Sequence, residues 1–360
     1  MEELTSRQQV ILAMIVREYI STARSIGSQT IVDDYGLRIS SATVRNEMAY
    51  LEAAGYLMHP HTSAGRVPTE KGYRYFVERL MEEAALSLAE QRMIRHQFSQ
   101  LQMDVKEWMK LAAAILARTT LTASVVSPPK AHRGRFKQLE LIPVHGATVL
   151  AVLVLQGGIV LQSMLGMEQP ISPDDLHQLS NRLTDVMSGL DVVGIRSRLP
   201  SMSLLQALCA QQVIAMMEGM DAPREMEIFR DGLLNVLNQP EYVETKNFRQ
   251  LVGVLESDAL LETLLAEAAP NTGVQIIIGG EGRWNELSEC SIVMARYGIM
   301  GEAVGSLGLL GPLRMPYARA VSAVRYVSDV LSELVYQFYG LPWEGTSPTS
   351  AAQEPGKLQE

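Results

Sequence analysis

The pattern of apolar and polar residues near the start of the chain predicts three helices in quick succession. Thr5 and Gln8 have the spacing of a capping box, and apolar residues recur at helical spacing from Val10 to Ile20. A second, shorter helix over residues 25–34 should end at Gly36. A third should begin at Ser40 or Ser41 and end at Ala54, with Gly55 in the left-handed stop position.

Two short strands and a polar loop are expected directly after the third helix. Residues 56–59 and 67–68 are the predicted strands, and residues 60–66 form the loop between them. Thr69 followed by Glu70 begins a further helix. A short helix with a polar N-terminal end and a polar loop behind it has the order of a DNA-recognition helix and its wing.

The rest of the chain predicts a mixed sheet that is split by an insertion. Residues 73–119 are helical and charged, and residues 317–339 form a long final helix with one apolar stripe. The predicted strands are residues 139–144, 149–155, 159–165, 274–278, 291–296 and 303–310, with a strand-like segment MEIFR near residue 228. Further helices are expected over residues 174–188 and 201–220 and around Leu233, Phe248 and Leu260.

The third helix divides into an apolar side and a polar side. On a helical wheel Val44, Met48 and Leu51 fall together and should pack inward. The opposite side holds Ala42, Asn46 and Ala49, flanked by Thr43 and Arg45. Alanines allow a helix to approach a groove closely, and Asn and Arg can pair with adenine or guanine edges.

The hydroxyls at the start of this helix and the cations after it suit phosphate. Amides at a helix N-terminus favour an anion, and a Ser-, Gly- and Arg-containing loop suits backbone or minor-groove contact. The candidate DNA contacts are Ser40, Ser41, Thr43, Arg45, Asn46, His61, Thr62, Ser63, Arg66, Lys71 and Arg74. The alternative for the helix is an ordinary capped helix with a solvated face, and for Lys71 and Arg74 it is surface solvation.

Charge is distributed unevenly along the chain. The formal net charge is −9, whereas residues 1–80 hold nine Lys or Arg and nine Asp or Glu, so the whole deficit lies beyond residue 80. A neutral domain still binds phosphate if its arginines share one face. Two distant cysteines argue against a disulfide framework, and the acidic start lacks the order of a secretion signal. We expect a cytoplasmic protein with no membrane partner.

No metal or cofactor site is expected. His59 and His61 stand alone and make a poor metal site. The run of residues 279–282 lacks the ending of a phosphate loop, and there is no nucleophile elbow and no zinc spacing. The sequence therefore argues against an enzyme.

Residues 4–76 carry a specific resemblance. The stretches LTSRQQVIL, SSATVRNEMAYLEAAGYL and PHTSAGRVPTEKGYR, with Gly27-Ser28 between them, are similar to the HrcA family, heat-inducible repressors of bacterial chaperone genes. Sparser matches occur later, at Ile278-Gly279, Cys290-Ser291, Tyr297, and residues 311–315 with Tyr317.

The resemblance implies an α+β multidomain protein with an N-terminal winged helix-turn-helix and a GAF-like α/β domain that carries an inserted small dimerising domain. The expected bounds are 1–76 for the winged helix, 77–120 for a helical linker, 121–215 and 273–342 for the split GAF-like domain, 216–272 for the insertion, and 343–360 for a disordered tail. The apolar stripes of residues 205–268 and of the last helix are candidates for dimer contacts, with burial inside one chain as the alternative.

The resemblance also implies partners. The family binds as a homodimer to an inverted-repeat DNA operator (CIRCE) upstream of the groE and dnaK chaperone operons, and the GroE chaperonin helps to keep the repressor active. Many relatives have Glu-Asn where Gly282 follows Glu281, and Thr where Leu313 stands. These differences weaken the case for a ligand pocket in the GAF-like domain. The alternative function is a metabolite-responsive winged-helix regulator with Arg296, Tyr297 and Arg314 as ligand contacts.

Overall fold

The computed structural model describes residues 4–36, 38–60, 65–82, 84–102, 104–131, 134–156, 158–219, 227–242, 245–267, 273–279, 284 and 287–343. Helices and antiparallel sheets make an α+β protein, as predicted. The chain divides into two compact units, of which the second is built mainly from Pro129–Glu225. Residues 344–360, where a disordered tail was expected, lie outside the described residues.

The N-terminal domain (residues 4–80) begins with the three predicted helices, α1 (Ser6–Thr22), α2 (Ser28–Tyr35) and α3 (Ser41–Ala53). The predicted capping box is present, because Thr5 accepts from the Gln8 amide and the Gln8 side chain accepts from the Thr5 amide. The expected start of the second helix at residue 25 is wrong. Ile26 is instead in extended conformation and pairs with Arg66, so α2 begins only after Gly27.

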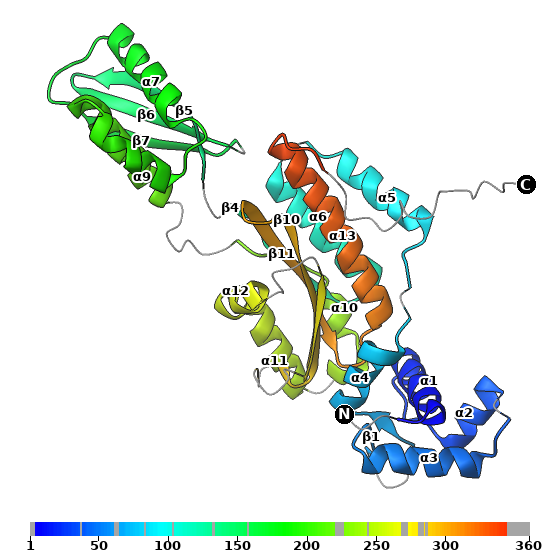
Figure 1. Cartoon of the computed structure of the whole chain (residues 1–360). Coiled ribbons are helices and arrows are strands. Elements are labelled where there is room, and N and C mark those ends of the chain that lie inside the picture. Colours follow the sequence, from blue (N-terminus) through cyan, green and yellow to red (C-terminus); the bar gives the residue numbers. More distant parts are fainter. Residues whose placement is uncertain are drawn as a thin grey trace, which may run out of the picture. The chain divides into compact units, whose positions relative to one another are not determined.

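A short antiparallel hairpin and a further helical segment complete this domain. Strand β1 (Leu57–Met58) pairs with β2 (Val67–Pro68), and α4 (Glu70–Tyr75) runs into the π-helical turn η1 (Phe76–Leu80). Thr69 caps α4 by accepting from the Gly72 amide at 3.1 Å. Figure 1 shows α3 and β1 at the end of this domain.

The segment predicted as a helical linker consists of α5 (Leu88–Ser99) and α6 (Val105–Thr120). It is helical, but it is part of a folded core. Trp108 and Met109 on α6 are fully buried, and Arg319 of the last helix binds Glu90 on α5 and the Thr119 carbonyl on α6. The predicted linker is therefore wrong for α6, half of whose residues are buried.

The core domain is a sheet with strand order β8-β3-β11-β10-β9, with β4 also paired to β11. Its strands are β3 (Ala123–Val126), β4 (Lys130–Ala131), β8 (Phe229–Asp231), β9 (Val274–Ile278), β10 (Cys290–Ile299) and β11 (Ala303–Pro312). The helices that cover it, besides α5 and α6, are α10 (Leu233–Leu237), α11 (Thr245–Glu256), α12 (Asp258–Glu267) and α13 (Tyr317–Phe338), with the 3-10 turn η3 (Pro240–Tyr242).

Both faces of this sheet are covered. Val125, Ile292 and Met294 pack into one apolar cluster with α11 and α12. Neighbouring residues point the other way, since Ser124 donates to the Ala113 carbonyl of α6 and Ser291 hydrogen-bonds the Tyr317 hydroxyl of α13. Figure 1 shows α6 and α13 on one side of β10 and β11 and α11 and α12 on the other.

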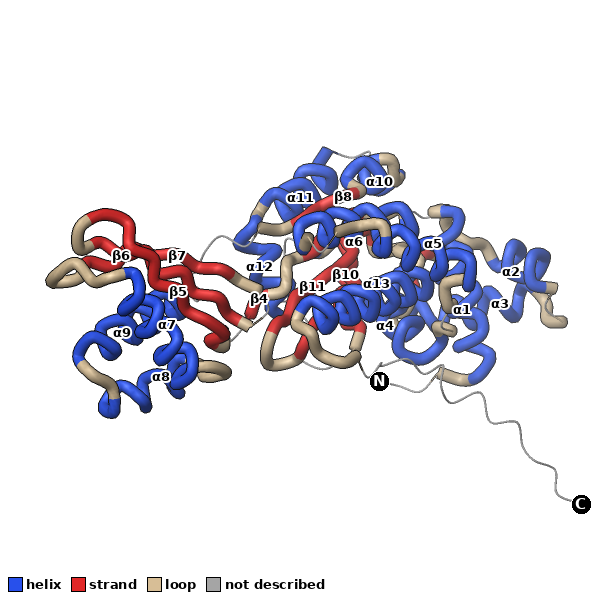
Figure 2. Tube along the Cα trace, turned by 90° about the horizontal axis from the view of Figure 1, so that it is seen from above, coloured by secondary structure: helices blue, strands red, loops and turns tan. Residues whose placement is uncertain are grey.

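A second, three-stranded sheet belongs to the other unit. Its strands β5 (Phe136–His145), β6 (Thr148–Leu155) and β7 (Val160–Gly166) form an antiparallel meander. The helices α7 (Pro173–Met187), α8 (Val192–Arg198) and α9 (Leu204–Glu218), with the 3-10 turn η2 (Leu199–Ser201), accompany it, and together they enclose a separate apolar core. Figure 2 shows these helices on one face of the sheet.

The predicted position of the insertion at residues 216–272 is wrong. The helices α10, α11 and α12 pack on the core-domain sheet, whereas residues 136–218 form the separate body, called the insertion below. The apolar stripes proposed for dimer contacts are largely buried within the chain as well, including Val213 on α9, Leu264 on α12 and Val324 on α13. The spacing of apolar residues predicted these helices, but it did not show against which sheet each helix packs.

Candidate nucleic-acid interface

Helix α3 presents the predicted polar face. Val44, Met48 and Leu51 are at most 1% exposed, so the wheel assigned the inward side correctly. Arg45 and Asn46 are exposed on the other side. Arg and Asn side chains can pair with guanine and adenine edges in the major groove, and Ala42 and Ala49 beside them are also exposed.

The start of α3 is a well-formed cap. The Thr43 amide donates to Ser40 Oγ at 3.2 Å, and the Ser40 and Thr43 hydroxyls lie 3.0 Å apart. Ser40 is exposed, and Ser41 and Thr43 are half-buried. The cap uses one of the amides at this helix end, and the others with the helix dipole still favour a phosphate.

A carboxylate at the end of α3 joins the two strands of the hairpin. Glu52 accepts from Arg66 Nε at 3.0 Å and contacts Nδ1 of His59. Burial favours a higher pKa for Glu52, but the hydrogen bonds from His59 and Arg66 and the Arg66 charge outweigh it and lower that pKa. Since the Arg66 side chain is only 12% exposed, its guanidinium holds the return strand to α3 and is not displayed to solvent.

The hairpin is also held by Ile26, which forms a short antiparallel bridge with Arg66. The Ile26 amide donates to the Arg66 carbonyl and the Arg66 amide donates to the Ile26 carbonyl, both at 2.9 Å. The two backbones can come this close because residue 65 is glycine. A Cβ on Gly65 would lie 2.3 Å from the Ile26 carbonyl oxygen. No local sequence signal pairs Ile26 with Arg66, so this contact was not predicted.

The two cations of α4 are engaged within the protein. Lys71 Nζ donates to the Ala54 carbonyl at 2.7 Å and lies 4.3 Å from the ring centre of Tyr56. Arg74 donates to the Ile276 carbonyl of β9 at 3.1 Å and lies near Glu78. Lys71 is exposed, so its ammonium can still face a phosphate, whereas the Arg74 side chain is only a quarter exposed. The predicted contacts His61, Thr62 and Ser63 lie outside the described residues.

A further contact of α3, made by Glu47, was not predicted from the sequence. Glu47 on α3 accepts from Arg7 at 3.4 Å and from Gln8 Nε2 at 3.2 Å. These bonds fix the middle of α3 against the start of α1. The residues are 39 or 40 positions apart, so no spacing rule could have found the contact.

The described residues offer no metal-binding group of three or more His, Cys, Asp or Glu side chains. Both cysteines are buried and unpaired, and burial raises the pKa of each thiol to about 11. Such thiols are poor nucleophiles. Within the same described residues, no helix combines the length and the apolar character that crossing a membrane requires.

Comparison with known proteins identifies the family. The model "HrcA protein C terminal domain" matches residues 106–321. The "Heat-inducible transcription repressor HrcA" of Roseiflexus castenholzii is 43% identical over 94% of this chain and 96% of that protein, and the repressor of the same name from Herpetosiphon aurantiacus is 42% identical over 94% and 97%. The chain belongs to the HrcA family.

The HrcA relatives are heat-inducible transcription repressors by name, and their match takes in nearly the whole chain. The match covers 94% of the chain, and the remaining residues are too few to reach from the N-terminus to α3. The candidate recognition helix is therefore part of the region that is similar to HrcA proteins. A crystal structure described as that of a hypothetical protein has a TM-score of 0.60 and 24% identity, and covers 93% of this chain and 100% of that one. It has the same fold as this HrcA chain.

Proposed function

We propose that this protein is a cytoplasmic heat-inducible repressor that binds double-stranded DNA through α3. The observation that carries the proposal is the exposed Arg45-Asn46 face of α3, supported from behind by a buried apolar side. In this proposal α2 and α3 form a helix-turn-helix and the β1–β2 hairpin is the wing, so the N-terminal domain is a winged helix. The core domain is the GAF-like domain of the family.

The DNA contacts divide by role. Arg45 and Asn46 read base edges, while Ser40, Ser41 and Thr43 at the helix N-terminus and Lys71 on α4 meet phosphates. His61, Thr62 and Ser63 remain proposed wing contacts. Arg66 and Arg74 act chiefly by positioning, because their guanidinium groups already bind Glu52 and the Ile276 carbonyl.

The repressor acts as a homodimer, and we propose the uncovered face of the insertion sheet as the contact surface. Three rows of side chains cross this face, namely Ile142–Leu150–Met164, Glu140–Val152–Gln162 and Gln138–Val154–Val160. Ile142, Val160 and Met164 are 46%, 52% and 60% exposed, whereas the opposite face is buried under the insertion helices. A largely apolar sheet face that is exposed in the single chain is typical of an interaction surface.

The operator is an inverted repeat upstream of chaperonin or related chaperone genes, and the GroE chaperonin supports the active state. These two points rest on the resemblance of the N-terminal stretches to the family. The structure favours a repeated site for a physical reason. One domain with no net charge gains little from phosphate attraction, so a second copy on a symmetric site supplies affinity.

The metabolite-sensing alternative loses its candidate ligand contacts. Arg296 donates to the Ala266 carbonyl, Tyr297 is fully buried, and Arg314 binds Gln239, Glu241 and the Ile20 carbonyl. Each of the three side chains is therefore bonded or buried within the described part of the protein.

A gel shift tests the proposal. The purified full chain is titrated on DNA from its own chaperonin-operon promoter and on a scrambled duplex, with and without GroE. Tight, sequence-dependent binding to the promoter is expected, with a further gain when GroE is present. Equal affinity for both duplexes under both conditions would refute the proposal.

A further inference from the structure

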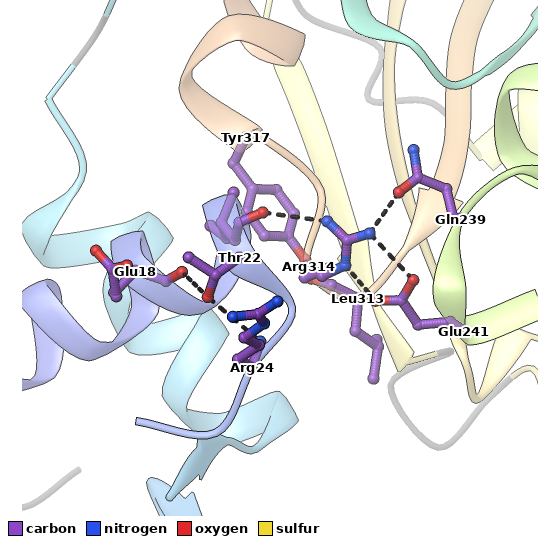
Figure 3. Close-up of polar contacts among 9 residues, drawn as sticks. Glu18, Thr22, Arg24, Gln239, Glu241, Leu313, Arg314 and Tyr317 are labelled. Carbon is purple, nitrogen blue, oxygen red and sulfur yellow. Dashed lines mark hydrogen bonds and ion pairs between the residues drawn. The ribbon is translucent and has the colours of Figure 1, made fainter. Parts of the chain in front are cut away.

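One arginine of the core domain holds the N-terminal domain in place. Arg314 lies two residues after the end of β11, and its Nη1 donates to the Ile20 carbonyl near the end of α1 at 3.1 Å. On its other side the guanidinium binds both carboxylate oxygens of Glu241, one at 3.2 Å, and the Gln239 side-chain oxygen. Figure 3 shows Arg314 between the end of α1 and the segment that carries Gln239 and Glu241.

Breaking this contact would remove a hydrogen bond from both the Ile20 carbonyl and the Arg314 side chain in a poorly solvated place. The Ile20 carbonyl is among the last of α1, where helix carbonyls have no intrahelical partner and where a cation is favoured by the helix dipole. The helix end is well defined, because the Ala23 amide bonds back to the Tyr19 carbonyl and the Thr22 hydroxyl to the Glu18 carbonyl. The Arg314 side chain is 12% exposed and that of Glu241 26%, so water replaces this contact poorly.

We call the contact of Arg314 with Ile20, Gln239 and Glu241 the Arg314 joint. Neighbouring contacts also connect the N-terminal domain to the core domain. The Tyr73 ring of α4 lies 6.0 Å from the Tyr317 ring of α13, and both side chains are buried. The Tyr317 hydroxyl is held in turn by the Leu313 carbonyl and Ser291. Arg74 reaches the Ile276 carbonyl of β9, so these contacts and the Arg314 joint connect α1 and α4 to two places on the core domain.

We propose that Arg314 is a positioning residue that fixes the DNA-binding domain on the core domain and thereby makes the dimer selective for the spacing between operator half-sites. The inference rests on the proposed function. In this inference Arg314 acts through the position of the N-terminal domain and not by contacting DNA itself.

The physical argument concerns effective concentration. When one α3 of a dimer has bound its half-site, the second binds as an intramolecular event whose gain depends on how well the two domains already match the spacing. Each subunit contributes one Arg314 joint to the path between the two α3 helices. Loosening both joints broadens the range of α3–α3 distances, which lowers affinity at the natural spacing and raises tolerance of other spacings.

Two Arg→Met variants of the full chain test this. Arg314→Met removes the joint and keeps much of the apolar stem. Arg319→Met is the matched control, because Arg319 also pairs with a glutamate, Glu90, and also donates to a helix-end carbonyl, that of Thr119, but within the core domain. Each variant is titrated on the natural inverted repeat, on repeats with the spacer lengthened by about half a helical turn and by about one full turn, and on a single half-site.

The expected result separates the two variants. Arg314→Met should bind the natural repeat about tenfold more weakly, bind the single half-site as well as the wild type, and discriminate less among spacings. Arg319→Met should keep the wild-type spacing profile. Glu241→Gln, which removes the anion from the same joint, should reproduce the Arg314→Met profile in a milder form, so the test survives if one variant folds poorly.

Two outcomes would overturn the inference. One is an unchanged spacing profile for both Arg314→Met and Glu241→Gln, and the other is tighter binding of the natural repeat by Arg314→Met, which would mean that the joint opposes DNA binding. Failure of the proposed function is distinguishable, because in that case the wild type itself would not prefer the repeat over scrambled DNA.

Discussion

Replacing Gly65 with alanine should detach the hairpin from the strand position at Ile26. A Cβ on Gly65 would lie 2.3 Å from the Ile26 carbonyl oxygen and 2.7 Å from its nitrogen, and both are backbone atoms that cannot rotate away. The pair of hydrogen bonds between Ile26 and Arg66 must therefore lengthen or break. At about 0.5–1.5 kcal/mol for each bond, the local cost is about 1–3 kcal/mol.

Amide hydrogen exchange measures this cost where it arises. The Ile26 and Arg66 amides of Gly65→Ala should exchange about fivefold to a hundredfold faster than in the wild type, since each 1.4 kcal/mol corresponds to a factor of ten. Gly27→Ala is the control, because the nearest atom to its added Cβ is the Thr30 hydroxyl at 3.8 Å. Operator affinity should fall for Gly65→Ala, because the hairpin proposed as the wing moves. Unchanged exchange at both amides would refute the steric reasoning.

Three further predictions concern the same molecule. Asn46→Ala and Arg45→Ala should each cost about 1–3 kcal/mol of operator binding and relax base preference in gel-shift titrations, and equal losses on operator and scrambled DNA would contradict base reading. The pKa of Glu52 is lowered from its ordinary value of 4.5, so its link to the wing should be intact above that pH and lost progressively as the pH falls below it. His59 side-chain NMR shifts should follow that loss, whereas Glu52→Gln should show no such acid transition. Met164→Glu should shift the protein from dimer to monomer in sedimentation equilibrium, while Gln162→Glu, which changes a polar neighbour on the same face, should shift it less.

Much of the fold could be predicted because its signals are local. The capping residues Thr5 and Ser40, the stop at Gly36 and the β-rich apolar run of residues 149–155 each act within a few positions of the chain. Local energies decide helix ends and strand propensity, so a single sequence suffices to place these elements. The inward side of α3 was correct for the same reason.

The parts that were missed depend on contacts between distant positions. Ile26 and Arg66 are each unremarkable in sequence, yet their pairing shortens α2 and anchors the hairpin. The insertion was misplaced because an apolar stripe predicts burial without identifying the partner, and α11 and α12 bury theirs on the core-domain sheet. Arg66 was predicted as a DNA contact, and its bond to Glu52 was missed because Glu52 lies 14 residues away on another element.

The fate of the basic residues changes how this protein should bind DNA. Arg66 is paired with Glu52, Arg7 with Glu47 and Arg74 with Glu78, so several cations of the N-terminal domain are balanced by carboxylates of the same domain. Counterion release by one such domain is therefore small, and its salt dependence should be shallow. In the proposed dimer, affinity must then come from shape and from having two domains at the correct separation. Under that requirement the rigidity of the Arg314 joint matters more than any single phosphate contact, because a poorly charged domain that is also loosely held would gain little from its second copy.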